Sequence, residues 1–393
     1  MNKSILNINF FKNSFLLLIP GGITSALIIV ISSGIWHYLS RETSTWLIQI
    51  IQLQMLGITI CKFGADQIGF ALLQNNLTKG IEVSALFKTR AVPLAIIFSI
   101  SILYFTNVFT TLCLLVSILF EVYNIITIVE KNALKQFKVV SIQLLLGYPL
   151  MLVLVLIVSY YMPLSNNFII AFLPIVSIIK FIYSRINRNK YEEYIKSVTD
   201  INVPIQQVEN FLLFKMDQVL LATILVKLSF FKSNYNIHDF VYLTKYPEIV
   251  TGVLTGIWAL YINDFSFDFT NNIFLFLKKH FGFLVILIAG IIIVGAIHFY
   301  LGKFTVSNVL FLYVLCFTNC ILILPVNLIN FQLMKLKKLK IINLLSLYSL
   351  LVGIFIIIIS FSFNFGWGLF LIVPCQLISF LIFFKLNKKK CLA

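Results

Sequence analysis

Long apolar segments alternate with short polar connections along the whole chain. A helix needs about 20 mainly apolar residues to cross the hydrocarbon core of a bilayer. These segments are apolar almost all round, whereas the strands of a membrane β-barrel alternate apolar and polar positions. The sequence therefore predicts an all-α polytopic membrane protein with about twelve transmembrane helices. We expect the spans at 14–36, 45–73, 92–108, 109–129, 139–160, 167–183, 205–226, 239–262, 281–300, 306–333, 341–362 and 366–384.

Composition leads to the same class of protein. The 393 residues are 60% hydrophobic and only 11% charged, and the mean hydropathy is +1.00. A soluble fold could not bury that much apolar surface.

The basic residues indicate how the helices cross the membrane. Most of the 30 Lys and Arg residues lie in the two termini and in alternate connections. The other connections hold only Arg41, Lys227, Lys232 and Lys303. Because Lys and Arg accumulate on the cytoplasmic side, we expect both termini to be cytoplasmic. The net charge of +16 is then an orientation signal and not a nucleic-acid surface.

The central charged stretch Ser184–Val203 divides the expected spans into two sets of six. It holds four basic and three acidic residues, which favours a cytoplasmic position. We therefore expect a six-helix lobe over 1–183, a cytoplasmic connection over 184–203, and a second six-helix lobe over 204–393.

Two equivalent spans carry polar stripes, one in each predicted lobe. Ionisable groups are costly at bilayer depth, so each is a functional candidate. Lys62 and Asp66 are four residues apart and can pair, as can Lys245 and Glu248 at a spacing of three. We expect these spans to form two walls of one polar cleft. The stripe of the second span comprises Thr45, Gln49, Gln52, Thr59, Lys62 and Asp66, and that of the eighth comprises Tyr242, Lys245, Glu248, Thr251 and Thr255.

Other spans contribute shorter polar sets. Lys215 and Asp217 lie two apart in the seventh span, on different faces of the helix. In the fourth span, Ser117, Glu121 and Asn124 share one face. A structural interpretation stands beside each functional one: the pairs can be intrahelical contacts that snorkel to headgroups, and Glu121 can lie at the interface. The lysine-rich connections are interpreted as orientation signals.

The chain lacks the motifs of enzymes and metal sites. No GxSxG, HExxH, Walker A or DxD pattern occurs. The four histidines lack metal-ligand spacing, and the six cysteines form no disulfide framework. We expect no metal, no cofactor and no catalytic residue.

Three segments resemble bacterial polysaccharide flippases of the Wzx type, in the multidrug/oligosaccharidyl-lipid/polysaccharide (MOP) superfamily. KFGADQIGFALLQNN (Lys62–Asn76) resembles the end of the family's second span. FKMDQVLLATIL (Phe214–Leu225) is similar to the start of its second lobe, and DFVYLTKYPEIVTGVLTG (Asp239–Gly256) is similar to its eighth span, with Tyr242 at a commonly seen tyrosine. In this segment the family's usual glycine, two residues before that tyrosine, is replaced by Phe240.

This resemblance implies a transporter of the bacterial inner membrane. It would move undecaprenyl-diphosphate-linked oligosaccharides to the periplasmic leaflet by alternating access, for O-antigen or capsule. Lys62, Lys215 and Lys245 would offset the anionic diphosphate or acidic sugars. Secondary candidates for the cleft are Arg41, Gln49, Gln52, Glu121 and Asn124.

The acidic cleft residues have a second role under the same resemblance. Asp66, Asp217 and Glu248 would hold the lysines when substrate is absent, and one of them could carry a coupling H⁺ or Na⁺. The partners would be the lipid-linked oligosaccharide, membrane lipids, and a polymerase and chain-length regulator, with no nucleic acid.

Two other functions remain open at this stage. One is the polysaccharide polymerase of the same kind of pathway, although no external connection is long enough for its usual catalytic loop. The other is a small-molecule exporter of the same superfamily.

The cleft hypothesis yields a first prediction. Lys62→Ala and Lys245→Ala should each abolish export of the lipid-linked oligosaccharide, because the anionic headgroup loses its counter-charge in a low-dielectric cleft. Expression should stay unchanged on immunoblots of membrane fractions. Normal export by both variants would contradict the assignment.

Overall fold

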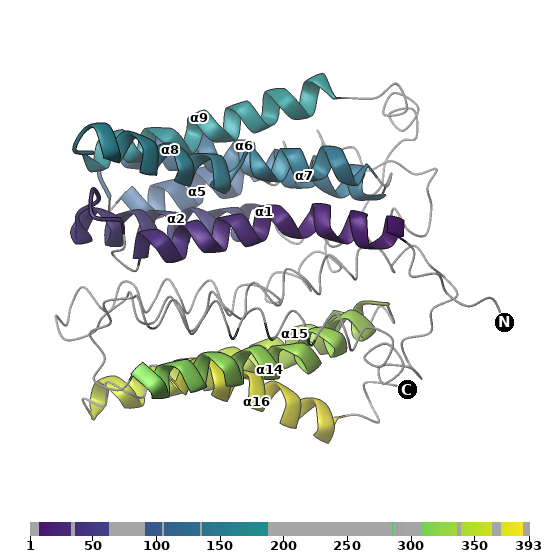
Figure 1. Ribbon diagram of the computed structural model, residues 1–393. Coiled ribbons are helices and arrows are strands. Elements are labelled where there is room, and N and C mark those ends of the chain that lie inside the picture. Colours follow the sequence, from purple (N-terminus) through teal and green to yellow (C-terminus); the bar gives the residue numbers. More distant parts are fainter. Residues whose placement is uncertain are drawn as a thin grey trace. The chain divides into compact units, whose positions relative to one another are not determined.

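The computed structural model describes part of the chain, and all its regular elements there are helices (Figure 1). The described residues are 8–32, 36–62, 91–103, 106–133, 136–187, 285, 289, 292, 309–335, 339–363 and 371–387. The chain divides into two compact units: Met1–Ile28 with Trp36–Val219, and Ile29–Ile35 with Leu220–Ala393. The expected lobe limits at 183 and 204 stay a prediction, because residues 188–284 lie outside the described ranges.

The helices coincide with the apolar segments wherever the structure describes them. The first unit contains α1 (Ile8–Ser32) as far as Ile28, with α2 (Arg41–Lys62), α5 (Val92–Leu103), α6 (Val108–Ala133), α7 (Phe137–Leu145), α8 (Tyr148–Tyr161) and α9 (Asn166–Ile186). The second contains α14 (Val309–Lys335), α15 (Leu339–Ser362) and α16 (Ile372–Leu386). The expected break near Thr106–Thr110 is confirmed, since α5 ends at Leu103 and α6 begins at Val108.

Six segments in the described part of the chain are long and apolar enough to cross a membrane. They are Glu42–Cys61, Val108–Ile125, Phe137–Tyr161, Asn166–Ile186, Tyr313–Asn330 and Ile341–Ser360. The expectation of a helical, multi-span protein is therefore confirmed. The total of twelve spans and the cytoplasmic position of both termini stay predictions, since the spans at 205–226 and 239–262 and almost all of 281–300 lie outside the described residues.

The fifth expected span differs from a single continuous helix. It is divided into α7 and α8 at Leu146–Gly147. Pro149 stands at the start of α8, where its missing N–H removes no helical hydrogen bond. A Cβ at Gly147 would lie 3.2 Å from the Leu144 carbonyl oxygen, so glycine is the residue that allows this tight junction.

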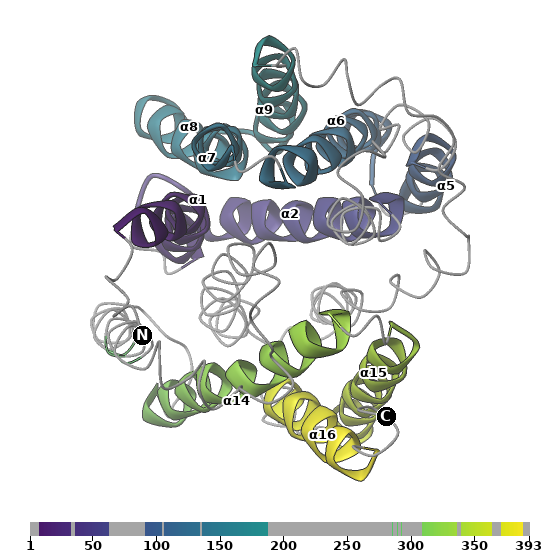
Figure 2. The same ribbon diagram turned by 90° about the vertical axis from the view of Figure 1, so that its right-hand side faces the viewer.

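Among the described helices of the first unit (Figure 2), α2 contacts α5, α6 and α9, and α8 contacts α7 and α9. Helix α6 contacts α2, α5, α7 and α9, and its contact with α9 is the most extensive between these described helices. The helices approach closely at Gly57 of α2, because a Cβ there would overlap the side chains of Ile118 on α6 and Phe98 on α5.

In the second unit, α14, α15 and α16 contact one another. The α15–α16 contact contains a reciprocal polar pair: Gln376 Nε2 donates to the Ser349 carbonyl oxygen (3.3 Å), and Ser349 Oγ donates to the Gln376 carbonyl oxygen (3.4 Å). Tyr348 and Phe383 stack beside it with their ring centroids 4.2 Å apart.

The close approach at Gly57 gives a second prediction. Gly57→Ala should lower the free energy of unfolding by about 1–3 kcal/mol, the usual result of overpacking a filled core. The measurement is the thermal unfolding midpoint of the purified protein in detergent. Gly22→Ala on α1 is the matched control, because in the described part of the chain no atom beyond its own helix backbone lies within 4 Å of its Cβ position. Equal midpoints for the two variants would show that Ile118 and Phe98 move aside freely.

Candidate functional site

The polar residues of α6 lie on one face of the helix and pack against polar residues of α9. Their spacing of three and four residues places them on one side of a helix. Both sets are buried, whereas Ile175, Ile179 and Ile182 of α9 are exposed. Helix α9 therefore turns its polar side inward and these three isoleucines outward. The two sets, which we call the α6–α9 polar cluster, comprise Ser117, Glu121, Asn124, Thr127 and Lys131 with Ser177, Lys180 and Ser184.

An ion pair lies at the centre of this cluster. Lys180 Nζ donates to Glu121 Oε2 at 2.6 Å, a short distance typical of a charge-assisted hydrogen bond. The side chains of Lys180 and Glu121 are 6% and 8% exposed. A Cβ at Gly147 would lie 3.5 Å from Lys180 Nζ, so the glycine junction between α7 and α8 borders the ammonium group directly.

Hydrogen bonds link α2 and α8 to the same face of α6. Gln54 Nε2 donates to Ser117 Oγ (3.1 Å), and the Tyr148 hydroxyl donates to Gln54 Oε1 (2.9 Å). These bonds join α2 and α8 to the α6–α9 pair.

A second buried lysine lies further along α6. Lys131 is fully buried, and its Nζ donates to both the carbonyl oxygen (3.3 Å) and the Oγ (3.2 Å) of Ser184. Ser184 Oγ donates to Thr127 Oγ1 (3.1 Å), which also accepts from Gln143 Nε2 (3.2 Å). These bonds replace the water that the ammonium group loses on burial.

Two buried oxygens in and beside the cluster accept no hydrogen bond from it. Asn124 Nδ2 donates to the Ser177 carbonyl oxygen (3.2 Å). The buried oxygens Asn124 Oδ1 and Gln143 Oε1 have no hydrogen-bond partner among the described residues. Since buried polar atoms are normally paired, these two oxygens leave the cluster able to accept further donors or a cation.

Near the end of α9, aromatic rings border the polar cluster. Phe181 packs edge-on against Phe120 and Tyr123 of α6, with ring centroids 5.1 and 5.0 Å apart. The Arg185 guanidinium lies 5.3 Å from the ring centroids of both Tyr123 and Phe181, a distance at which a cation–π interaction forms.

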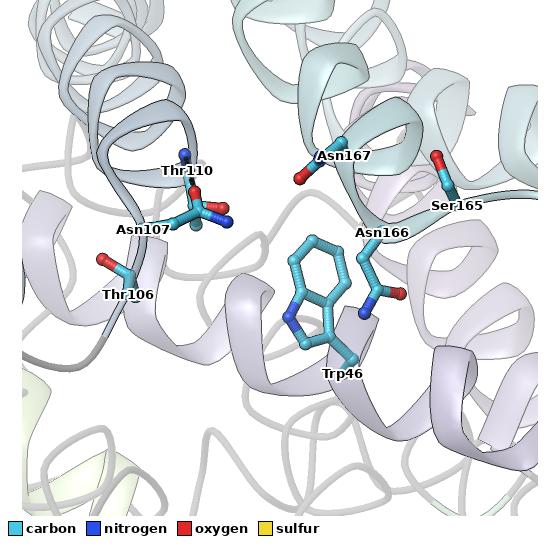
Figure 3. Close-up of a pocket in the computed structure, with 7 residues that line it drawn as sticks. All are labelled: Trp46, Thr106, Asn107, Thr110, Ser165, Asn166 and Asn167. Carbon is cyan, nitrogen blue, oxygen red and sulfur yellow. Dashed lines mark hydrogen bonds between the residues drawn. The ribbon is translucent and has the colours of Figure 1, made fainter.

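A pocket lies at the other end of α6 and α9 (Figure 3). Its volume is about 420 Å³, and it is lined by Trp46, Thr106, Asn107, Thr110, Ser165, Asn166 and Asn167. These residues come from α2, from the turn before α6 and the first turn of α6, and from the start of α9. We call this site the Trp46 pocket.

Most residues expected in the cleft lie outside the described ranges. These are Asp66, Lys215, Asp217, Tyr242, Lys245 and Glu248. Lys62 ends α2 and Arg41 begins it, but their side chains also lie outside the described part. The two-walled cleft therefore stays a prediction.

Four of the secondary candidates have described positions. Glu121 and Asn124 are buried in the α6–α9 polar cluster, so Glu121 is not exposed as a purely interfacial residue would be. Gln52 is buried, and Gln49 Nε2 is buried without a hydrogen-bond partner among the described residues. The residue of α2 that reaches the cluster is Gln54, which is absent from the expected stripe.

Two of the basic residues that we counted with the cytoplasmic connections when predicting the topology, Lys131 and Lys180, do not lie in connections. Lys131 and Lys180 are buried side chains within α6 and α9. Lys180 lies inside the expected span 167–183 and is three and four residues from Ser177 and Ser184. That helical spacing was the signal that could have identified it.

The ion pair yields a third prediction. Glu121→Ala and Lys180→Ala should each lower the free energy of unfolding by about 3–5 kcal/mol, because each leaves an uncompensated buried charge. The double variant should lose less than the sum of the two, since it leaves no charge behind. Thermal unfolding of the purified protein in detergent measures both effects.

The control for this cycle is Lys138→Ala on α7, whose side chain is exposed. It should change the free energy of unfolding by no more than about 0.5 kcal/mol, as is usual for surface substitutions. Strict additivity of the two single variants would contradict a direct Lys180–Glu121 interaction.

The fold is similar to that of MATE transporters of known structure. A MATE crystallised with the ligand MaL6 superposes with a TM-score of 0.60 at 12% identity, over 97% of this chain and 96% of that one. An outward-facing multidrug resistance MATE family transporter of the MOP superfamily gives 0.57 at 13% identity, over 97% and 95%. A MATE in the straight conformation gives 0.56 at 12% identity, over 97% and 95%. No family model and no curated protein matches the chain. At such low identity the likeness establishes the fold alone: this chain has the helical fold of the MATE transporters.

Proposed function

We propose that this chain is a membrane transporter that moves undecaprenyl-diphosphate-linked oligosaccharides between the leaflets of the bacterial inner membrane. Two independent lines support the proposal. The fold is that of MATE transporters, one of which belongs to the MOP superfamily. Three sequence segments, beginning at Lys62, Phe214 and Asp239, resemble the polysaccharide flippases of the same superfamily.

The observation that carries the proposal is the buried Lys180–Glu121 ion pair. Burying two ions costs several kcal/mol per ion, and a well-packed apolar pair would often be as stable or more stable. An ionisable group retained at membrane depth is therefore a functional candidate. Beside it, Gln54 of α2 donates a hydrogen bond to Ser117 of α6, and Tyr148 of α8 donates one to Gln54.

The pair suits the transport of an anionic headgroup. A diphosphate that approaches Lys180 would compete with Glu121 for the ammonium group, since both are oxygen anions. The displaced Glu121 would then take up a proton or Na⁺, because an unpaired carboxylate is not stable in this interior. Substrate entry would in this way be coupled to the movement of a cation.

The expected cleft residues complete the proposed path. Lys62, Lys215 and Lys245 would offset the anionic charge at other points along it. Asp66, Asp217 and Glu248 would hold these lysines while the path is empty. The lipid tail would stay in the bilayer while the two units alternate in access.

A small-molecule exporter is the second candidate, and the fold supports it equally. One of the similar structures is a multidrug resistance transporter. The two functions differ in substrate, since only the flippase acts on a lipid-linked oligosaccharide. The polysaccharide polymerase remains a third alternative, which the experiment below separates from the flippase.

The test is the surface polysaccharide of a strain that lacks the gene. Loss of all surface repeat units, with lipid-linked single units accumulating inside, is the expected result. Single units that survive on the outer surface, with only the long-chain ladder missing, would favour the polymerase. An unchanged polysaccharide profile would favour the small-molecule exporter.

Complementation of that strain tests the ion pair itself and gives a fourth prediction. The double variant Glu121→Leu with Lys180→Met removes both charges and leaves no unpaired charge in the interior. We expect it to reach the membrane and to lower export by at least about ten-fold, which corresponds to about 1.4 kcal/mol.

The matched control is Gln376→Met in α16. Gln376 is about as buried as Lys180 and Glu121, and the substitution removes one interhelical hydrogen bond but no charge. It should restore export. Full export by the charge-free double variant would refute a transport role for the pair.

A further inference from the structure

The Trp46 pocket differs in chemistry from the α6–α9 polar cluster. Figure 3 shows the indole of Trp46 between the turn before α6 and the first residues of α9. Six polar residues surround the indole. The volume of about 420 Å³ lies within the range of about 300–1,000 Å³ that is usual for small-molecule sites.

Part of this polar lining is explained by the fold. Asn107 Oδ1 accepts a hydrogen bond from the Thr110 backbone N–H (2.7 Å), and Ser165 Oγ accepts one from the Phe168 N–H (3.3 Å). Both residues cap the first turn of a helix. The Thr106 hydroxyl donates to the Ile102 carbonyl oxygen (3.0 Å).

The rest of the lining has no such structural use. The side-chain amides of Asn166 and Asn167 and the hydroxyl of Thr110 make no hydrogen bond to another described residue. Asn166 and Asn167 are exposed, and Thr110, which is 3% exposed as a whole residue, borders the pocket. Their polar groups are therefore available to a ligand that enters the pocket.

The chemistry of the lining restricts what that ligand can be. None of the seven residues is ionisable, so a phosphate or an ammonium group would find no counter-charge. A single aromatic ring is not the cage that binds quaternary cations. An indole offers a flat apolar face, and each carboxamide offers both donors and an acceptor. Together they suit a ring with one apolar face and several hydroxyl groups around its edge.

We propose that the Trp46 pocket binds a neutral sugar ring, with its C–H face on the indole and its hydroxyls on Asn166, Asn167 and Thr110. The pocket lies at the end of the helices that the charge distribution predicts to be external. The identification of the sugar as part of the translocated oligosaccharide rests on the proposed function, whereas the binding itself does not. Sugar binding in the Trp46 pocket would then follow diphosphate binding at Lys180 or occur independently of it.

The test measures the binding of free sugars to the purified full-length protein in detergent. Saturation-transfer NMR is the method. The probes are the neutral methyl glycosides of glucose, galactose and N-acetylglucosamine, and glucuronic acid as the charged counterpart of glucose. We expect at least one neutral glycoside to bind saturably and glucuronic acid to bind more weakly. Trp46→Ala and Asn167→Ala should each weaken binding by about ten-fold, which is about 1.4 kcal/mol.

Trp36→Phe is the matched control, because Trp36 is another tryptophan of the same unit that lies outside the Trp46 pocket. Its indole Nε1 donates to Ser159 Oγ (2.9 Å), and it lines a separate apolar groove. The Trp36→Phe variant should bind the sugar as the unsubstituted protein does. The proposal is overturned if no neutral glycoside binds, or if Trp46→Ala binds as well as Trp36→Phe.

The two proposals fail in different ways. Absence of sugar binding together with lost export in the deletion strain would reject the Trp46 pocket as a sugar site and keep the flippase. Trp46-dependent sugar binding together with unchanged export would keep the sugar site and reject the flippase.

Discussion

The first unit depends on one physical constraint: a charged lysine amine must be kept inside a bundle of apolar helices. Lys180 meets this constraint through Glu121, 2.6 Å away, and Gly147 leaves space beside the ammonium group. An unpaired ammonium group in such an interior would be unstable. Helices α6 and α9 are therefore held in one register, in which Glu121, Asn124 and Lys131 of α6 meet Ser177, Lys180 and Ser184 of α9. The break between α7 and α8 is part of this packing, because Gly147 at the break borders the Lys180 ammonium group.

Two sites with different kinds of side chain lie along helices α6 and α9. The α6–α9 polar cluster is charged, whereas the Trp46 pocket is lined only by neutral side chains. Glu121 follows Thr110 by eleven positions in α6, which is about 16.5 Å along a helix. A substrate with an anionic group joined to neutral sugars has the same division of chemistry. Movement of α6 against α9 would affect both ends together, since both helices run through the two sites.

The helical pattern of the chain was largely predictable from local information. Hydrophobic length determines where a helix can cross a membrane, so α6, α9 and α15 begin and end within a few residues of the expected limits. The stripe that contains Glu121 and Asn124 was also recognisable, because helical spacing places those residues on one face. Gln54 was not recognisable in this way, since its role depends on the positions of Ser117 and Tyr148 on other helices.

The sequence by itself determined the class of protein, the positions of the described helices and the inward face of α6, because these follow from hydrophobicity and helical periodicity. Only the tertiary structure decided which charges are buried. Lys131 and Lys180 stand near the ends of their segments, where a lysine can equally extend to the cytoplasmic surface. The packing of α9 on α6 places both inside. The Trp46 pocket likewise exists only because three separate parts of the chain meet there, and such a meeting leaves no periodic signal in any one of them.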